Sequence, residues 1–247
     1  MKNPILTVLL CLFVTVLTSS VYAQITYEYA LTSGFQAAQP EAPALIQIPN
    51  NEGHSGDFMK RVVRKSSCGK TKSTQGYFFE DDAGLQFNNP EGFIGESYSI
   101  AFNFMIDEFI SPPSWVRILS FTHTDDAGIH ILLTKAPEYG TLELWPHGTV
   151  GKSNFFMPEE FYQMILTRNE RGLLKIYING KVFAEYDDSE SRIYVPQAPD
   201  HYIIWFRDYP KLGKGEASPG FVSDIELANF TWTKDDVSKK WEEFCSE

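Results

Sequence analysis

The sequence lacks the short motifs by which many enzymes are recognised. It contains no Gly-x-Ser-x-Gly elbow, Walker loop, dinucleotide fingerprint, His-Glu-x-x-His or Cys-x-x-Cys. Basic residues are also scarce, because 21 Lys and Arg stand against 32 Asp and Glu, for a formal net charge of −11. This charge argues against nucleic acid or an anionic membrane as a partner. It is compatible with neutral sugars, cations or basic proteins, and equally with an acidity that serves only solubility.

Long apolar runs are absent after the first 23 residues. Residues 5–17 form an uncharged apolar run behind Lys2, and Val21-Tyr22-Ala23 ends in the small residue that a signal peptidase needs. We therefore expect residues 1–23 to be a signal peptide and residues 24–247 to form a single domain that is secreted, either periplasmic or extracellular. The alternative is a retained anchor, but the run is short for a bilayer span of about 20 residues. No membrane insertion is expected after cleavage.

Cysteine is rare, with three residues in the chain. One of them, Cys11, lies inside the apolar run, which leaves Cys68 and Cys245 after cleavage. Outside the cytosol such a pair usually forms a disulfide bond, which here would tie the early region to the extreme C-terminus. The alternative is two free thiols.

The clearest strand pattern lies between residues 160 and 188. Three strand-like runs are separated by turn signals at residues 169–172 and at Asn179-Gly180, where a type I′ turn would need positive φ at both residues. In the middle run Leu174, Ile176 and Ile178 share one face. This pattern predicts an antiparallel meander with one side buried.

Similar strand patterns recur along the chain every 8 to 14 residues. Residues 76–79 and 85–87 are expected to pair as a hairpin, whereas residues 31–72 are expected to be loop with one or two short strands. Near the end, Thr233 and Asp236 predict a capping box that starts one short helix. About twelve strands and this helix predict an all-β fold, a two-sheet antiparallel sandwich with one short C-terminal helix.

Several segments resemble laminin G-like modules of the concanavalin A-like superfamily of lectins and glucanases. They are YSIAFNF at 98–104, WVRILSF at 115–121, LTRN at 166–169 with KIYING at 175–180, and, as in bacterial secreted members, IWFRD at 204–208 with residues 216–222. The resemblance covers roughly residues 76–244 and implies a jelly-roll sandwich whose first and last strands pair, in agreement with a Cys68–Cys245 bridge. The superfamily hosts lectins, adhesion modules and glycosidases, so the resemblance leaves the function open.

One acidic run is a candidate catalytic site. Glu185, Asp187 and Glu190 have the Glu-x-Asp-x-x-Glu spacing of the catalytic strand in concanavalin A-like endoglucanases. The resemblance implies a nucleophile, an orienting acid and a general acid for a retaining mechanism, in which two carboxyl groups lie about 5 Å apart. The positions between them are polar rather than apolar, which favours the solvated end of a hairpin.

Histidines and acids suggest two metal sites. A turn centred on Asp126-Ala127 would place His123 opposite His130, where with Asp125 they could hold zinc, although solvent-facing histidines are commoner. Asp208 and Glu216 bracket a loop of the kind that binds calcium in several relatives. Because only these two carboxylates are apparent and Arg207 could pair with either of them, an ion pair is favoured over a calcium cofactor.

Aromatic residues at strand ends are candidate sugar platforms. Trp145 with His147 beside it and Tyr209 next to Asp208 could stack against a sugar ring, whereas Trp205 sits inside an apolar run and is expected in the core. We therefore expect a non-catalytic module that binds a glycan or an extracellular protein through its rim loops. The alternatives are a glycoside hydrolase or lyase that uses Glu185 and Glu190, and a purely structural extracellular domain. Neither the ligand nor the oligomeric state follows from the sequence.

Overall fold

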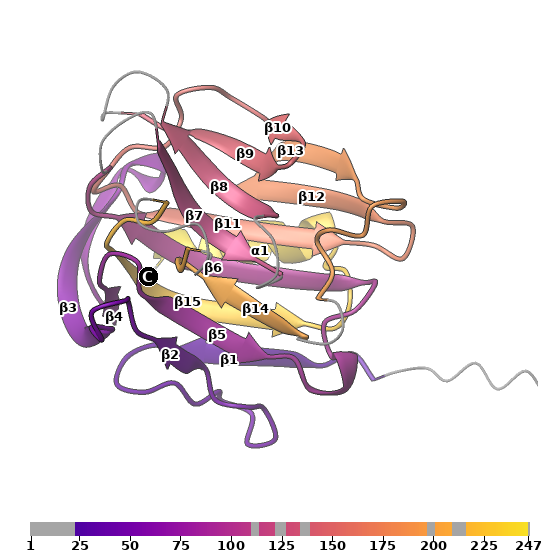
Figure 1. Cartoon of the computed structure of the whole chain (residues 1–247), viewed down its shortest axis with the longest axis horizontal. Helices are drawn as coiled ribbons and strands as arrows, with labels where there is room; N and C mark the ends of the chain where they lie inside the picture. Colours follow the sequence, from indigo (N-terminus) through magenta and orange to yellow (C-terminus); the bar gives the residue numbers. More distant parts are fainter. Residues whose placement is uncertain are drawn as a thin grey trace, which may run out of the picture.

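Two antiparallel sheets lie face to face in the computed structural model of this chain (Figure 1). The structure describes residues 23–109, 114–121, 127–133, 139–196, 201–208 and 216–246, so the expected signal peptide up to residue 22 lies outside the described residues. The larger sheet has the strand order β13-β12-β11-β6-β15-β4-β3, and β1 also pairs with β15. The smaller sheet has the order β10-β9-β8-β7-β14-β5-β2. The expected all-β, two-sheet antiparallel sandwich is confirmed.

The strand bounds are as follows. The larger sheet consists of β1 (Thr26–Ala30), β3 (Gly56–Lys65), β4 (Lys70–Phe79), β6 (Tyr98–Ile106), β11 (Tyr162–Arg168), β12 (Leu173–Ile178), β13 (Lys181–Asp187) and β15 (Gly220–Ala228). The smaller sheet consists of β2 (Ile46–Ile48), β5 (Gly84–Asn88), β7 (Ser114–Ser120), β8 (Gly128–Leu133), β9 (Thr141–Trp145), β10 (Gly148–Thr149) and β14 (Tyr202–Trp205). One α-helix, α1 (Lys234–Ser246), and two 3₁₀ turns, Ser66–Cys68 and Pro90–Gly92, complete the described elements.

The core between the sheets is aromatic and apolar. Phe102 and Phe104 of β6 face Phe206, which follows β14, and Phe79 of β4 stacks on the same ring with centroids 4.1 Å apart. Trp205 is fully buried among these rings, which confirms its expected place in the core. Burying such large side chains supplies the main driving force for closing one sheet over the other.

The expected meander forms β11, β12 and β13 at one edge of the larger sheet. Leu174, Ile176 and Ile178 point into the core. The turn between β12 and β13 has φ of 52° at Asn179 and 73° at Gly180, as a type I′ turn requires. The local sequence pattern therefore predicts this part of the fold correctly.

Two expectations about the first third of the chain are wrong. The region 31–72 contains β3, a ten-residue strand rather than a short one. Its charged pattern resembles a loop because β3 is an edge strand, where charged side chains discourage further strand pairing. Strands β4 and β5 do not pair as a hairpin either, because the chain crosses at residues 80–83 from the larger sheet to the smaller one.

The two ends of the described chain lie together. Strand β1 pairs with β15 from Thr26 opposite Ala228 to Ala30 opposite Asp224, and a disulfide bond joins Cys68 to Cys245 with an S–S distance of 2.04 Å. The two sequence expectations, paired end strands and a bridge between distant cysteines, are thus met in one structure.

Helix α1 covers the outer face of the larger sheet (Figure 1). Its start is the expected capping box, because the Asp236 amide donates to Thr233 Oγ1 and the Thr233 amide donates to Asp236 Oδ2. Val237 and Phe244 on its apolar face are buried against the sheet. Among the described residues no helix combines the length and hydrophobicity that crossing a bilayer would take.

Candidate functional site

A row of polar and charged residues crosses the outer face of the smaller sheet. Arg117 on β7 stands opposite His130 on β8, and His130 stands opposite Glu143 on β9. Residues opposite each other in antiparallel strands share a face, and their neighbours Ile129 and Leu144 point the other way into the core. A continuous polar row of this kind in the middle of an apolar sheet is unusual, because burying charged groups is costly unless they are paired.

Two tryptophans flank this row on the same face. Trp115 lies two residues before Arg117 on β7, and its indole N–H donates to Glu143 Oε2 at 2.5 Å. Trp145 lies two residues after Glu143 on β9 and keeps 38 % of its surface exposed. Asp208 and Glu216, at the ends of one loop, complete the group. We call the whole group the outer-face cluster: Trp115, Arg117, His130, Glu143, Trp145, Asp208 and Glu216.

The Arg117 guanidinium links the two loop-end acids of the cluster. Its Nη2 lies 3.4 Å from Asp208 Oδ1 and 3.8 Å from Glu216 Oε2, and Asp208 follows β14 while Glu216 precedes β15. The Arg117 amide also donates to the Glu216 carbonyl at 2.8 Å. The favoured ion pair is therefore present with a different cation, because Arg207 instead binds Asp82 at 2.6 Å.

Gly128 makes room for this guanidinium. A Cβ atom at Gly128 would lie 2.6 Å from the Leu119 carbonyl oxygen and 3.2 Å from Arg117 Nη1. Any side chain here would press on both the β7 backbone and the Arg117 side chain. The glycine at the start of β8 thus allows a long charged side chain to lie close to the sheet.

His130 is the least satisfied member of the cluster. Its side chain is 1 % exposed, and neither ring nitrogen has a hydrogen-bond partner among the described residues. It lines a cavity of about 100 Å³ together with Trp115, Trp145 and Glu216. A water needs roughly 10–15 Å³ of such space, so the cavity has room for several polar atoms of a ligand. An unpartnered imidazole that faces such a space is suited to receive a hydrogen-bonding ligand.

Burial and the Arg117 guanidinium hold the pKa of His130 well below 6.5. Below pH 6.5 the unfolded chain therefore binds a proton at His130 that the folded protein does not, so stability falls as the pH falls. We expect the free energy of unfolding to fall, because of His130, by up to about 1.4 kcal/mol for each unit by which the pH is lowered in this range. Urea unfolding of the wild type and His130→Gln between pH 5 and 7 measures this contribution. If the free energy of unfolding changed with pH equally in the two proteins, this prediction would be contradicted.

Of the three residues that the sequence suggested as a sugar platform, the structure describes Trp145 and His147. Trp145 belongs to the outer-face cluster. His147 is turned toward the edge of the larger sheet, where its ring stacks on Tyr186 with centroids 4.4 Å apart and its Nε2 lies 2.8 Å from the Tyr186 hydroxyl. Tyr209 lies outside the described residues.

The carboxylates of the suggested catalytic run lie elsewhere. Glu185 and Asp187 are on β13 at the edge of the larger sheet, Glu190 is in the following turn, and all three are exposed. Glu185 Oε1 lies 2.8 Å from Lys175 Nζ. Hydrogen bonds from the side chain and backbone of Ser189 lower the pKa of Asp187 and keep it ionised. The catalytic roles of these three residues stay a prediction.

Neither suggested metal site is assembled among the described residues. Opposite His130 the structure has Arg117, not His123, so the expected register of β7 and β8 is wrong. Ser120 already pairs with Gly128, so the connection between the two strands is longer than the tight turn expected at Asp126-Ala127, and a bulge between Arg117 and Leu119 shifts the pairing further. His123 and Asp125 lie outside the described residues. No group of three or more His, Cys, Asp or Glu in the described chain is placed to hold a metal ion. The Arg117 guanidinium lies 3.4 Å from Asp208 Oδ1 and 3.8 Å from Glu216 Oε2, and calcium binding by this loop stays a prediction, because residues 209–215 lie outside the described residues.

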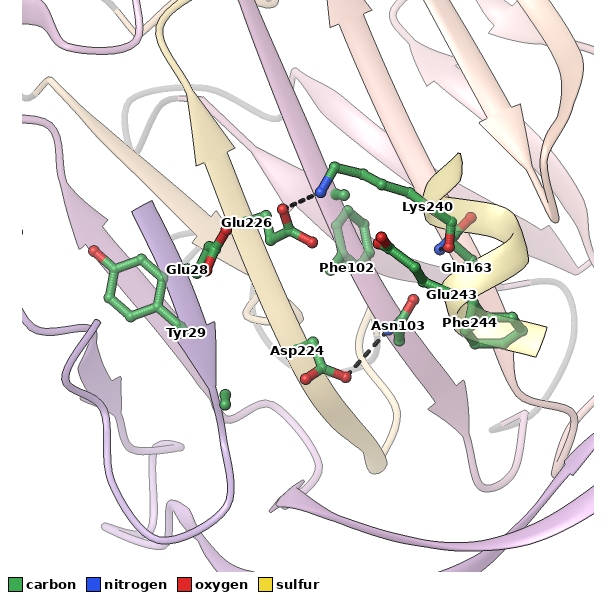
Figure 2. A pocket seen from close by; sticks show the side chains of 12 residues that line it. Glu28, Tyr29, Phe102, Asn103, Gln163, Asp224, Glu226, Lys240, Glu243 and Phe244 are labelled. Atoms are coloured by element: carbon green, nitrogen blue, oxygen red, sulfur yellow. Dashed lines mark hydrogen bonds and ion pairs between the residues drawn. The ribbon is translucent and has the colours of Figure 1, made fainter. Parts of the chain in front are cut away.

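A larger hollow of about 190 Å³ lies on the opposite side of the molecule, between α1 and the larger sheet. Figure 2 shows its acidic lining, with Glu226 paired to Lys240 and Asp224 accepting from Asn103 at 3.1 Å. Burial raises the pKa of Glu226. The aromatic rings at this hollow are those of Tyr29, Phe102 and Phe244, each at most 2 % exposed. It therefore offers no open ring face, unlike Trp145 in the outer-face cluster.

Sequence reasoning singled out four members of the cluster, His130, Trp145, Asp208 and Glu216, but as separate sites. It missed Trp115, Arg117 and Glu143. A signal for them exists: Trp115-x-Arg117 and Glu143-x-Trp145 place large aromatic and charged residues on one face of strands whose other face is apolar. Their convergence depends on strand register, which that pattern does not give.

No family model and no curated protein matches the sequence. Solved structures do match the fold. Domain 4 of an extracellular GH43 arabinanase from Geobacillus stearothermophilus, solved with arabinotriose, is 12 % identical, with 86 % of this chain and 96 % of that chain covered and a TM-score of 0.58. The binding domain of botulinum neurotoxin DC, solved with SialylT, is 12 % identical over 89 % of this chain and 51 % of that chain, with a TM-score of 0.56.

A Trypanosoma rangeli sialidase is 14 % identical to this chain. The match covers 86 % of this chain and 36 % of the sialidase, with a TM-score of 0.52. Identities this low indicate a shared fold and do not carry function from one protein to another. The comparisons therefore establish that the chain has a β-sandwich fold of the kind found in these proteins, while the laminin G-like resemblance stays a prediction.

Proposed function

We propose that this chain is a non-catalytic carbohydrate-binding module and that the outer-face cluster is its sugar site. The observation that carries the proposal is the cavity in which Trp115 and Trp145 lie beside the buried, unpartnered His130. Sugars are bound by aromatic rings that cover their C–H faces and by polar groups that fix their hydroxyls, and this combination is found here on one face of one sheet. The site lies on the sheet face and its loop ends rather than on the rim loops alone.

The comparisons support this proposal without establishing it. Two of the similar structures were solved with glycan ligands, arabinotriose and SialylT. The acidic charge of the chain is compatible with a neutral or weakly charged glycan and unfavourable for anionic polymers. The Cys68–Cys245 disulfide supports a place outside the cytosol, where secretion through residues 1–23 would bring the protein.

The direct test is binding of the purified chain to a glycan array, followed by titration calorimetry with the glycans that bind. Trp145→Ala should weaken binding at least about tenfold, a loss of about 1.4 kcal/mol, because exposed aromatic anchors dominate such sites. Ile46→Ala is the matched control, since Ile46 is similarly exposed (44 %) but lies on β2 at the other edge of the same sheet. Equal affinity of the two variants would contradict the assignment of the site.

The enzyme alternative is tested on the same glycans. Incubating each bound oligosaccharide with the wild-type chain should release no shorter product, since the proposed module binds without turnover. Hydrolysis that is lost in Glu185→Gln would instead support the hypothesis that the chain is a glycoside hydrolase that uses Glu185. If the chain bound an extracellular protein but none of the glycans on the array, protein recognition would be favoured instead.

A further inference from the structure

We infer that the outer-face cluster selects electrically neutral sugar units and discriminates against sugars that carry a carboxylate. This inference rests on the proposed function and adds the chemical class of the ligand. It follows from the kinds and charges of the groups around the cavity, taken over the described residues.

The net charge of the outer-face cluster is negative. Glu143, Asp208 and Glu216 contribute three carboxylates to the cluster, against the one guanidinium of Arg117. That guanidinium already lies within 4 Å of both Asp208 and Glu216, so its charge is balanced from within the protein. A ligand carboxylate beside Glu216 would meet a like charge, and like-charge contacts at a binding site are unfavourable.

The hydrogen-bonding capacity of His130 is a second ground for this inference. A neutral imidazole presents one N–H donor and one lone-pair acceptor. A hydroxyl group can accept from the first or donate to the second, so it satisfies whichever nitrogen faces the cavity. A carboxylate can only accept, and an imidazolium that would attract it is disfavoured by burial and by the neighbouring Arg117.

The polar side chains of the cavity wall also favour a ligand that can donate hydrogen bonds. Trp115 already gives its indole N–H to Glu143, so this donor is engaged within the protein. Glu216, whose side chain is 25 % exposed, also lines the cavity, and a carboxylate there can only accept hydrogen bonds. Sugar hydroxyls can donate to such acceptors, whereas an anionic group cannot.

The experiment compares matched glycans on one array, each neutral oligosaccharide printed beside its sialylated or uronate counterpart. For the glycans that bind, we expect the neutral member to bind at least about tenfold more tightly than its acidic counterpart. Equal or tighter binding of the acidic members would overturn this inference and leave the proposed function standing. Binding of neither class would overturn both.

A charge variant adds a readout that does not depend on the identity of the sugar. Glu216→Gln removes one carboxylate charge but retains its backbone contact with Arg117. The ratio of neutral to acidic affinity should fall several-fold in this variant. Glu190→Gln, which removes a charge from an exposed turn after β13 at the edge of the larger sheet, is the control and should leave the ratio unchanged. An unchanged ratio in Glu216→Gln would overturn the charge-based selection.

Discussion

Replacing Asp188 with alanine is expected to lower the free energy of unfolding by about 3–5 kcal/mol, because it removes the buried partner of Arg168. The Arg168 guanidinium then keeps only the half-exposed Glu96, 3.0 Å away, to balance its charge. Asp188 and Arg168 are 0 % and 1 % exposed, and Arg168 Nε lies 2.9 Å from Asp188 Oδ2. Asp188 also accepts hydrogen bonds from the Ser191 hydroxyl and the Ile193 amide, both at 2.9 Å. The carboxylate thus holds the loop after β13 against the end of β11.

The measurement is thermal or urea unfolding, with an expected decrease in melting temperature of roughly 6–20 °C for a domain of this size. Asp187→Ala is the matched control, since Asp187 is the preceding residue, carries the same charge and is exposed. Its effect should stay within about 0.5 kcal/mol. A melting temperature for Asp188→Ala equal to that of Asp187→Ala would show that the buried ion pair does not stabilise the fold.

Removing the disulfide should also be costly, by about 2–5 kcal/mol. Cys68 and Cys245 are separated by 177 residues, so the bridge closes a very long loop in the unfolded chain, and the chain-entropy model places such a loop at the upper end of that range. Other contacts keep α1 on the sheet, including the Lys65 Nζ bond to the Phe244 carbonyl at 2.7 Å. We therefore expect a protein that is still folded but markedly less stable.

Urea unfolding of the Cys68→Ser, Cys245→Ser double variant, compared with the oxidised wild type, measures this contribution. A reducing agent should lower the urea midpoint of the wild type and leave the midpoint of the double variant unchanged. A wild-type midpoint that does not respond to reduction would mean that the bridge is not formed in the purified protein.

Local patterns in the sequence predicted the strands far better than their pairing. Alternation in Leu174, Ile176 and Ile178 correctly indicated the buried face of β12, and Asn179-Gly180 correctly indicated its turn. These features are determined by residues close together in the chain. The crossing from β4 to β5 is not, because a short turn at residues 80–83 is compatible both with a hairpin and with a change of sheet.

The candidate site was only partly predictable for the same reason. His130 was recognised as chemically interesting, but its neighbours Arg117 and Glu143 come from two other strands, β7 and β9, and β7 carries a bulge in its pairing with β8. Asp208 and Glu216 were expected to pair with the adjacent Arg207, but the cation beside them is Arg117, and Arg207 pairs with Asp82 instead. Which charged groups meet is decided by tertiary packing, and sequence proximity was a poor guide to it.

The most direct test of the sugar site uses the indole N–H signals of the five tryptophans in a ¹⁵N-labelled sample. On titration with a glycan that binds on the array, the signals of Trp115 and Trp145 should shift, because both rings line the cavity. The signals of Trp205 in the core and of Trp232 and Trp241 near α1 should stay in place. Shifts confined to Trp232 and Trp241 would put the ligand on the opposite sheet and contradict the assignment of the outer-face cluster.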